Sequence, residues 1–100
     1  MIKAEQKGKL PKILVPVHLC GLPCDMKKIH QLAKKYQFKI IEDASHAHGA
    51  SVRGIKAGNF GDISVFSLHQ RKALSVGDGG VVCTSNENFY NNTIYNIISI

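Results

Sequence analysis

The hydrophobic and polar positions along the 100-residue chain predict alternating strands and helices. Short apolar, β-branched runs at 12–18 and 38–42 are typical of buried strands, although Pro16 interrupts the first. Between them Asp25 is placed to cap a helix. Strand, helix and strand within about 30 residues form a βαβ unit, whose strands run parallel. The helix is predicted by apolar positions at helical spacing: Ile29, Leu32, Ala33 and Tyr36.

The second half of the chain is rich in predicted turns. Seven of the nine glycines lie between Gly49 and Gly80, which indicates tight turns and close backbone approaches. Two further strands are predicted at 63–68 and 80–84, and Asn86 is placed to cap a last helix. The final ten residues, 91–100, show no helical periodicity. The segment at 20–24, with its Gly and Pro, reads as a loop. The predicted fold class is α/β with mostly parallel strands.

Composition narrows the class of protein. Hydrophobic residues make up 44% and charged residues 20% of the chain, which is ordinary for a globular domain. No apolar run approaches the roughly 20 residues of a membrane-spanning helix. Three cysteines without a secretory leader favour a reduced, cytoplasmic protein over a disulfide framework.

The net charge of +6 raises the question of a nucleic-acid partner. Nine of the thirteen Lys and Arg residues lie within 1–39. A solvated lysine-rich helix face explains them better than a nucleic-acid surface, because no interleaved aromatic residues accompany them. His18, Cys20 and Cys24 raise the separate question of a metal. Their Cys-x3-Cys spacing without a second pair does not make a four-ligand zinc site, so no metal is predicted.

Chemistry-bearing residues follow two of the predicted strands. Asp43 comes directly after the second strand, and Ser67, His69 and Lys72 lie at or just after the end of the third. Ligands of open parallel sheets bind beyond the carboxyl ends of the strands. If the two strands are parallel, a carboxylate, a hydroxyl, imidazoles and a lysine share one sheet edge. Such a set suits an aldehyde cofactor held by the lysine as a Schiff base, with the carboxylate balancing a ring nitrogen.

Four stretches, in order and in register, carry a family resemblance across residues 12–90. They are Val-Pro-Val-His-Leu-Cys-Gly-Leu-Pro-Cys-Asp-Met at 15–26, Ile-Glu-Asp-Ala-Ser-His-Ala-His-Gly-Ala at 41–50 with Gly54 and Gly-Asp-Ile at 61–63, Phe-Ser-Leu-His-Gln-Arg-Lys at 66–72, and Gly-Asp-Gly-Gly-Val-Val-Cys-Thr at 77–84. The sequence resembles the DegT/StrS family of sugar aminotransferases. These enzymes use pyridoxal phosphate on the aspartate-aminotransferase fold.

The resemblance implies a role for each matching residue. Lys72 would bind the cofactor's aldehyde as a Schiff base and shuttle the substrate proton. Asp43 would pair with the protonated pyridine nitrogen, and Ser67 would donate to the cofactor phosphate. His46 stands where the family often has Gln, near the ring's phenolic oxygen. Asp78 replaces the glutamate common in the family's Gly-Glu-Gly-Gly loop.

The resemblance also implies the setting of this site. The chain is expected to be one partial domain, 1–100, from the cofactor-binding large domain of a fold type I enzyme. The whole enzyme would transfer an amino group from glutamate or glutamine to a keto-sugar or keto-cyclitol, as a homodimer. Family members are several times longer, so we expect the isolated 100-residue chain to be inactive. Two alternatives remain open: a non-catalytic truncated remnant, and a related sugar dehydratase, although some dehydratases replace the lysine that Lys72 retains.

Overall fold

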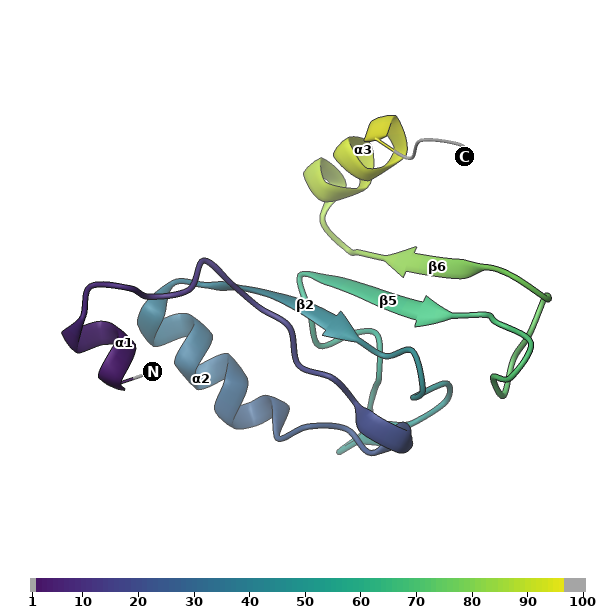
Figure 1. Cartoon of the computed structure of the whole chain (residues 1–100), viewed down its shortest axis with the longest axis horizontal. Helices are drawn as coiled ribbons and strands as arrows, with labels where there is room; N and C mark the ends of the chain where they lie inside the picture. The colour runs from purple at the N-terminus through teal and green to yellow at the C-terminus, as the bar shows by residue number, and fades with distance from the viewer. Residues whose placement is uncertain (1, 97–100) are drawn as a thin grey trace.

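The computed structural model describes residues 2–96 and has an α/β fold. Figure 1 shows helix α2 lying along one side of a small twisted sheet, with α3 beyond the opposite edge. The elements, in chain order, are α1 (Ile2–Gln6), β1 (Ile13–Leu14), the short 3-10 turn η1 (Leu19–Gly21), α2 (Met26–Tyr36), β2 (Lys39–Asp43), β3 (Ser51–Val52), β4 (Ile55–Lys56), β5 (Ile63–Ser67), β6 (Gly80–Cys83) and α3 (Glu87–Asn96).

The main sheet has the strand order β1-β2-β5-β6. Strands β1 and β2 are parallel and joined through α2, which confirms the predicted βαβ unit. Strand β5 also runs parallel to β2, whereas β6 returns antiparallel to β5. The sheet is therefore mostly parallel with one antiparallel edge strand, a common arrangement in α/β folds.

The first strand is shorter than the sequence predicted. Only Ile13 and Leu14 form a ladder with β2, where 12–18 was expected. Pro16 has no N–H to give to the ladder, so the chain leaves it there. The segment rejoins the sheet at an isolated bridge between Val17 and Asp43. The last residue of β2 is therefore still paired with this segment, despite the interruption at Pro16.

Helix α2 supplies one side of the core. Its N-cap is Asp25, as predicted, whose Oδ1 accepts from the Lys28 N–H at 3.2 Å. Ile29, Ala33 and Tyr36 pack against the core as predicted, but Leu32 is 36% exposed, so its expected place in the apolar face is wrong. The buried cluster under the helix consists of Met26, Phe38, Ile40 and Phe60.

Four local features departed from the sequence-based expectation. Helix α1 and the β3–β4 hairpin were not predicted; both are only a turn or two residues long, too short for a periodic signal. The loop expected at 20–24 begins within the turn η1. The expected lack of helix after residue 90 is wrong for 91–96, which belong to α3, while 97–100 lie outside the described residues. Asn86 caps α3 as predicted, its Oδ1 accepting from the Phe89 N–H at 3.1 Å.

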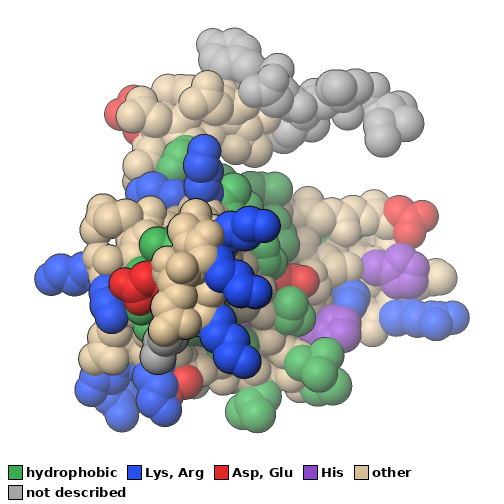
Figure 2. All heavy atoms as spheres, turned by 60° about the vertical axis from the view of Figure 1, so that its left-hand side comes forward, with side chains coloured by type: hydrophobic (Ala, Val, Ile, Leu, Met, Phe, Trp, Pro, Cys, Tyr) green, Lys and Arg blue, Asp and Glu red, His purple; other side chains and the backbone are tan. Residues whose placement is uncertain are grey.

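Lysine side chains and apolar side chains are both prominent on the surface. Figure 2 shows Lys and Arg side chains gathered over the face that α1 and α2 present. On the sheet face opposite α2, apolar side chains stay open to solvent: Ile13 is 52%, Val17 49% and Val82 48% exposed. Parallel sheets usually have both faces covered. Within residues 2–96, no helix is long and apolar enough to cross a membrane.

Candidate functional site

Two strand ends define the candidate site. In the parallel register of β2 and β5, Asp43 lies opposite Val65, so Asp43 and Ser67 lie at the carboxyl ends of neighbouring strands. The expected shared edge is therefore confirmed. His69 and Lys72 follow in the loop after β5. Strands β2 and β5 end on the same side of the sheet, so the loops that follow them leave from the same edge (Figure 1).

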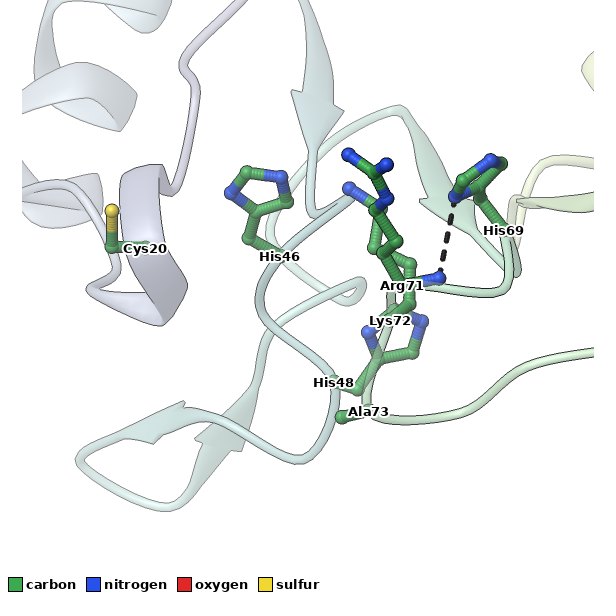
Figure 3. A pocket seen from close by; sticks show the side chains of 7 residues that line it. All are labelled: Cys20, His46, His48, His69, Arg71, Lys72 and Ala73. Atoms are coloured by element: carbon green, nitrogen blue, oxygen red, sulfur yellow. Dashed lines mark hydrogen bonds between the residues drawn. The ribbon is translucent and has the colours of Figure 1, made fainter.

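A cavity of about 420 Å³ opens beside this edge and brings together residues from three segments. Figure 3 shows Cys20 of η1 on one side, His46 facing it from the loop after β2, and the loop after β5 on the other side. Of the predicted site residues, Lys72 and His46 line the cavity, whereas Asp43 and Ser67 lie at the strand ends outside its lining. The full lining is Cys20, His46, His48, His69, Arg71, Lys72 and Ala73.

A tight turn presents Lys72 to this cavity. The Lys72 N–H donates to the His69 carbonyl at 2.8 Å, and the Arg71 N–H reaches His69 Nδ1 at 3.3 Å. The His69 N–H in turn lies 3.3 Å from Ser67 Oγ. Ser67 therefore anchors the start of the turn that carries Lys72. Asp78, in the following loop, lies 3.9 Å from His69 Nε2.

Asp43 is held as a carboxylate by the loop that follows it. Its Oδ1 accepts from the Ser45 N–H at 3.0 Å, a local turn typical of Asp. The Ser45 side chain and backbone N–H together hold the pKa of Asp43 below its ordinary range. A carboxylate that stays charged at neutral pH is suited to balance a cationic ring nitrogen.

His46 is placed by close contact with the turn η1. A Cβ added at Gly21 would lie 3.1 Å from the His46 carbonyl oxygen. Gly21 also has a φ of +83°, in the left-handed region that favours glycine. The turn can therefore pack directly against the backbone of His46 and leave its side chain free toward the cavity.

The sequence reasoning missed a buried carboxylate next to Asp43. Glu42 is 0% exposed and accepts from His18 Nε2 at 2.9 Å. Burial favours a raised pKa for Glu42, but hydrogen bonds from the Gly58 N–H, His18, the Phe60 N–H and the Ser64 hydroxyl outweigh it and hold the pKa below its ordinary range. The available signal was the spacing: Glu42 lies two residues after the buried Ile40, on the same face of the strand.

We expect the folded chain to lose stability in acid, because the pKa values of the Glu42 and Asp62 carboxyl groups are lowered by folding. The pKa of Asp62 is also held low: burial favours a rise, but the Ile40 N–H at 2.8 Å and Lys39 at 3.1 Å outweigh it. A pKa below the unfolded value contributes stability that is complete above the unfolded pKa and lost as pH falls through the folded one.

The denaturant midpoint should therefore fall as pH is lowered past the ordinary values of 4.5 for Glu42 and 3.8 for Asp62. Urea titrations at a series of pH values measure it. Asp62→Asn should flatten the lower part of this profile, because one of the linked carboxylates is gone. A midpoint that stays level through this range contradicts the expectation.

The donor set fits an anionic, carbonyl-bearing cofactor. Arg71 offers positive charge to a phosphate, and Lys72 carries the amine that an aldehyde requires. His48 adds a buried Nε2 that has no hydrogen-bond partner in the described chain and belongs to a residue lining the cavity. The volume is within the range of roughly 300–1,000 Å³ common for small-molecule sites. Across residues 2–96, no three His, Cys, Asp or Glu side chains are placed to share a metal ion.

Comparison with known proteins decides the family. The model of the DegT/DnrJ/EryC1/StrS aminotransferase family matches residues 3–96. The chain belongs to this family. The fold agrees with the partial aminotransferase-like α/β domain expected from the sequence, because its solved structural neighbours are aminotransferases.

Family members of known activity share much of this chain's sequence. GDP-perosamine synthase of Escherichia coli O157:H7 is 40% identical over 84 residues, which are 84% of this chain and 23% of the synthase. UDP-N-acetyl-3-dehydro-alpha-D-glucosamine 3-aminotransferase of Acidithiobacillus ferrooxidans is 48% identical over 75 residues, 74% of this chain and 20% of that protein. The chain thus spans about a fifth of the length of these relatives.

Solved structures of aminotransferases superpose on the chain. An aminotransferase from Psychrobacter cryohalolentis matches with a TM-score of 0.77 at 42% identity, over 79% of this chain and 20% of its own. A DegT/DnrJ/EryC1/StrS aminotransferase from Brucella abortus matches with a TM-score of 0.84 at 30% identity, over 90% of this chain and 25% of its own.

Proposed function

We propose that this chain is the cofactor-binding segment of a pyridoxal-phosphate-dependent sugar aminotransferase. The observation that carries the proposal is the placement of Lys72 in a positively charged cavity beside the sheet edge where Asp43 ends β2. Pyridoxal phosphate, when bound, supplies an aldehyde that takes up amines and a cationic ring that withdraws electrons from the neighbouring carbon.

The chain's own residues would divide the remaining work. Lys72 Nζ would attach the cofactor and, once released, move the proton at the reacting carbon. The Asp43 carboxylate would accept a hydrogen bond from the ring nitrogen and keep it protonated. Ser67 would contribute to the phosphate contacts, and His46 would donate to the ring's phenolic oxygen. Arg71 would add positive charge at the cavity.

The relatives support a substrate class. Their names specify GDP-perosamine synthesis and amino transfer to a UDP-linked 3-dehydro-glucosamine. We therefore propose that the whole protein transfers an amino group from glutamate or glutamine to a nucleotide-linked keto-sugar for polysaccharide biosynthesis. In the same proposal, residues 1–100 form part of the large domain of a cytoplasmic homodimer.

Trapping the cofactor tests the site directly. The chain is incubated with pyridoxal phosphate, reduced with borohydride and digested, and the modified lysines are counted by mass spectrometry. We expect modification to concentrate on Lys72, because the cavity adds phosphate contacts that the other lysines lack. Lys72→Ala should remove most of the label, whereas the matched control Lys56→Ala, at an exposed residue of β4, should not. Label spread evenly over the surface lysines contradicts the proposal.

A further inference from the structure

The buried Glu42 directly precedes Asp43 in the chain, and the two are the last residues of β2. Successive side chains of a strand point to opposite faces of the sheet. Whatever fixes the direction of Glu42 therefore also fixes the direction in which Asp43 leaves the strand.

Glu42 is fixed from three separate parts of the chain. Its Oε1 accepts from His18 Nε2 at 2.9 Å and from the Gly58 N–H at 2.6 Å. Its Oε2 accepts from the N–H groups of Phe60 at 2.9 Å and Gly61 at 3.0 Å. The Ser64 hydroxyl of β5 donates to the same Oε2 at 2.9 Å. Five charge-assisted hydrogen bonds leave this carboxylate one orientation.

His18 links this network to the backbone of Asp43. The Cys24 N–H donates to His18 Nδ1 at 3.1 Å, so the ring hydrogen lies on Nε2 and is directed at Glu42. The His18 N–H donates to the Asp43 carbonyl at 3.0 Å. The Asp43 N–H donates to the Pro16 carbonyl at 2.9 Å. The segment from Pro16 to His18 therefore hydrogen-bonds to the main chain of Asp43 and to the side chain of Glu42.

We propose that Glu42 is a positioning residue of the candidate site. Its buried hydrogen bonds fix the end of β2 so that the Asp43 carboxylate is held in its turn with Ser45 and presented at the sheet edge. This inference rests on the proposed role of Asp43. The alternative is that Glu42 only stabilises the fold and leaves the direction of Asp43 unaffected.

The carboxyl titration of Asp43 separates the two readings, because they predict opposite signs in Glu42→Gln. Removal of a neighbouring negative charge would by electrostatics alone lower the pKa of Asp43. Loss of positioning would weaken the Ser45 hydrogen bond and raise the pKa toward its ordinary value of 3.8. We expect the rise. Carbon-13 NMR of the folded, cofactor-free chain measures it, read only from resonances of the folded species.

A second variant keeps the test decisive if Glu42→Gln does not fold. Ser64→Ala removes one donor to Glu42 without changing any charge, and it should raise the pKa of Asp43 by a smaller amount. The matched control is His30→Phe, which removes the hydrogen bond from His30 Nε2 to the Phe60 carbonyl at 2.7 Å but leaves all five hydrogen-bond donors to Glu42 in place. It should leave Asp43 unchanged. Apart from Glu42 itself, the titratable groups whose charges act on the Asp43 carboxylate are His46 and His18, and both are kept in all three variants.

A rise in Glu42→Gln or Ser64→Ala with no rise in His30→Phe supports the inference. A fall or no change in the folded variants overturns it, and so does an equal rise in His30→Phe. The measurement needs no cofactor, so it is independent of the trapping experiment at Lys72. Failure of that trapping would overturn the proposed function, whereas failure of the Asp43 titration would overturn only the positioning role of Glu42.

Discussion

Glu42→Leu is expected to unfold the chain. Five hydrogen-bond donors converge on the Glu42 carboxylate, and leucine offers none of them an acceptor. A buried donor left without a partner costs about 1–3 kcal/mol. Three of the five donors, those of His18, Phe60 and Ser64, are buried, and the N–H groups of Gly58 and Gly61 are partly buried. Their combined loss is comparable with the total stability of a small domain, which is about 5 kcal/mol at its lower end. Far-ultraviolet circular dichroism in increasing urea should show no cooperative transition.

The matched control is Glu87→Leu. Glu87 is an exposed glutamate in the first turn of α3, so the same change there should alter stability by only about 0.5 kcal/mol. Replacing a buried charged pair by apolar groups is sometimes neutral. Here, however, the Glu42 carboxylate accepts hydrogen bonds from three backbone N–H groups. A side-chain substitution cannot remove those donors, so they would stay without a partner. A folded Glu42→Leu chain with an unchanged urea midpoint would contradict this account of the core.

The sequence predicted secondary structure most accurately where a single hydrophobic periodicity dominates. The apolar spacing of α2 and its cap at Asp25 depend on neighbours within one or two turns, so they were readable without the fold. The shared edge of Asp43 and Ser67 was predicted on the condition that the strands at 38–42 and 63–68 run parallel, and the structure meets that condition. The antiparallel return of β6 has no such local signature.

The environment of Glu42 could not be predicted because its partners come from distant parts of the chain. His18 lies 24 residues before Glu42, and Phe60 lies 18 residues after it. Only the folded chain brings them around one carboxylate. The positive cavity was likewise hidden, because Cys20, His46 and Arg71 belong to three separate loops. The four motifs that carry the family resemblance contain these residues, but motifs alone do not show which of them touch.

The site and the core therefore share one support. The segment from Pro16 to the turn η1 pairs with Asp43, donates to Glu42 through His18 and packs against His46 through Gly21. Asp43 and His46 of the proposed site are thus attached to the most buried polar network in the described chain, that of His18, Glu42 and Ser64. Changes in that network should act on the site even where they touch no ligand, since strand ends move with the residues that hold them.

Gly61→Ala is expected to be the most damaging small change in this network. A Cβ at Gly61 would lie 2.5 Å from the Ile63 carbonyl oxygen and 3.0 Å from both the Glu42 backbone nitrogen and its Cβ. Two of these neighbours are backbone atoms, which cannot swing aside. The loop must shift, which weakens the 3.0 Å hydrogen bond from the Gly61 N–H to Glu42. Overpacking usually costs about 1–3 kcal/mol, and we expect the upper end or more because the hydrogen bond is strained as well.

Gly49→Ala is the matched control for this change. Gly49 has a φ of +76°, but nothing lies within 4 Å of the added Cβ. The cost there is the left-handed backbone alone, about 1–2 kcal/mol. Urea midpoints of the two variants measure the difference, and hydrogen exchange should show the Phe60 and Gly61 amides losing protection only in Gly61→Ala. A Gly61→Ala variant destabilised no more than Gly49→Ala would mean that close packing of Gly61 on Glu42 does not hold this loop in place.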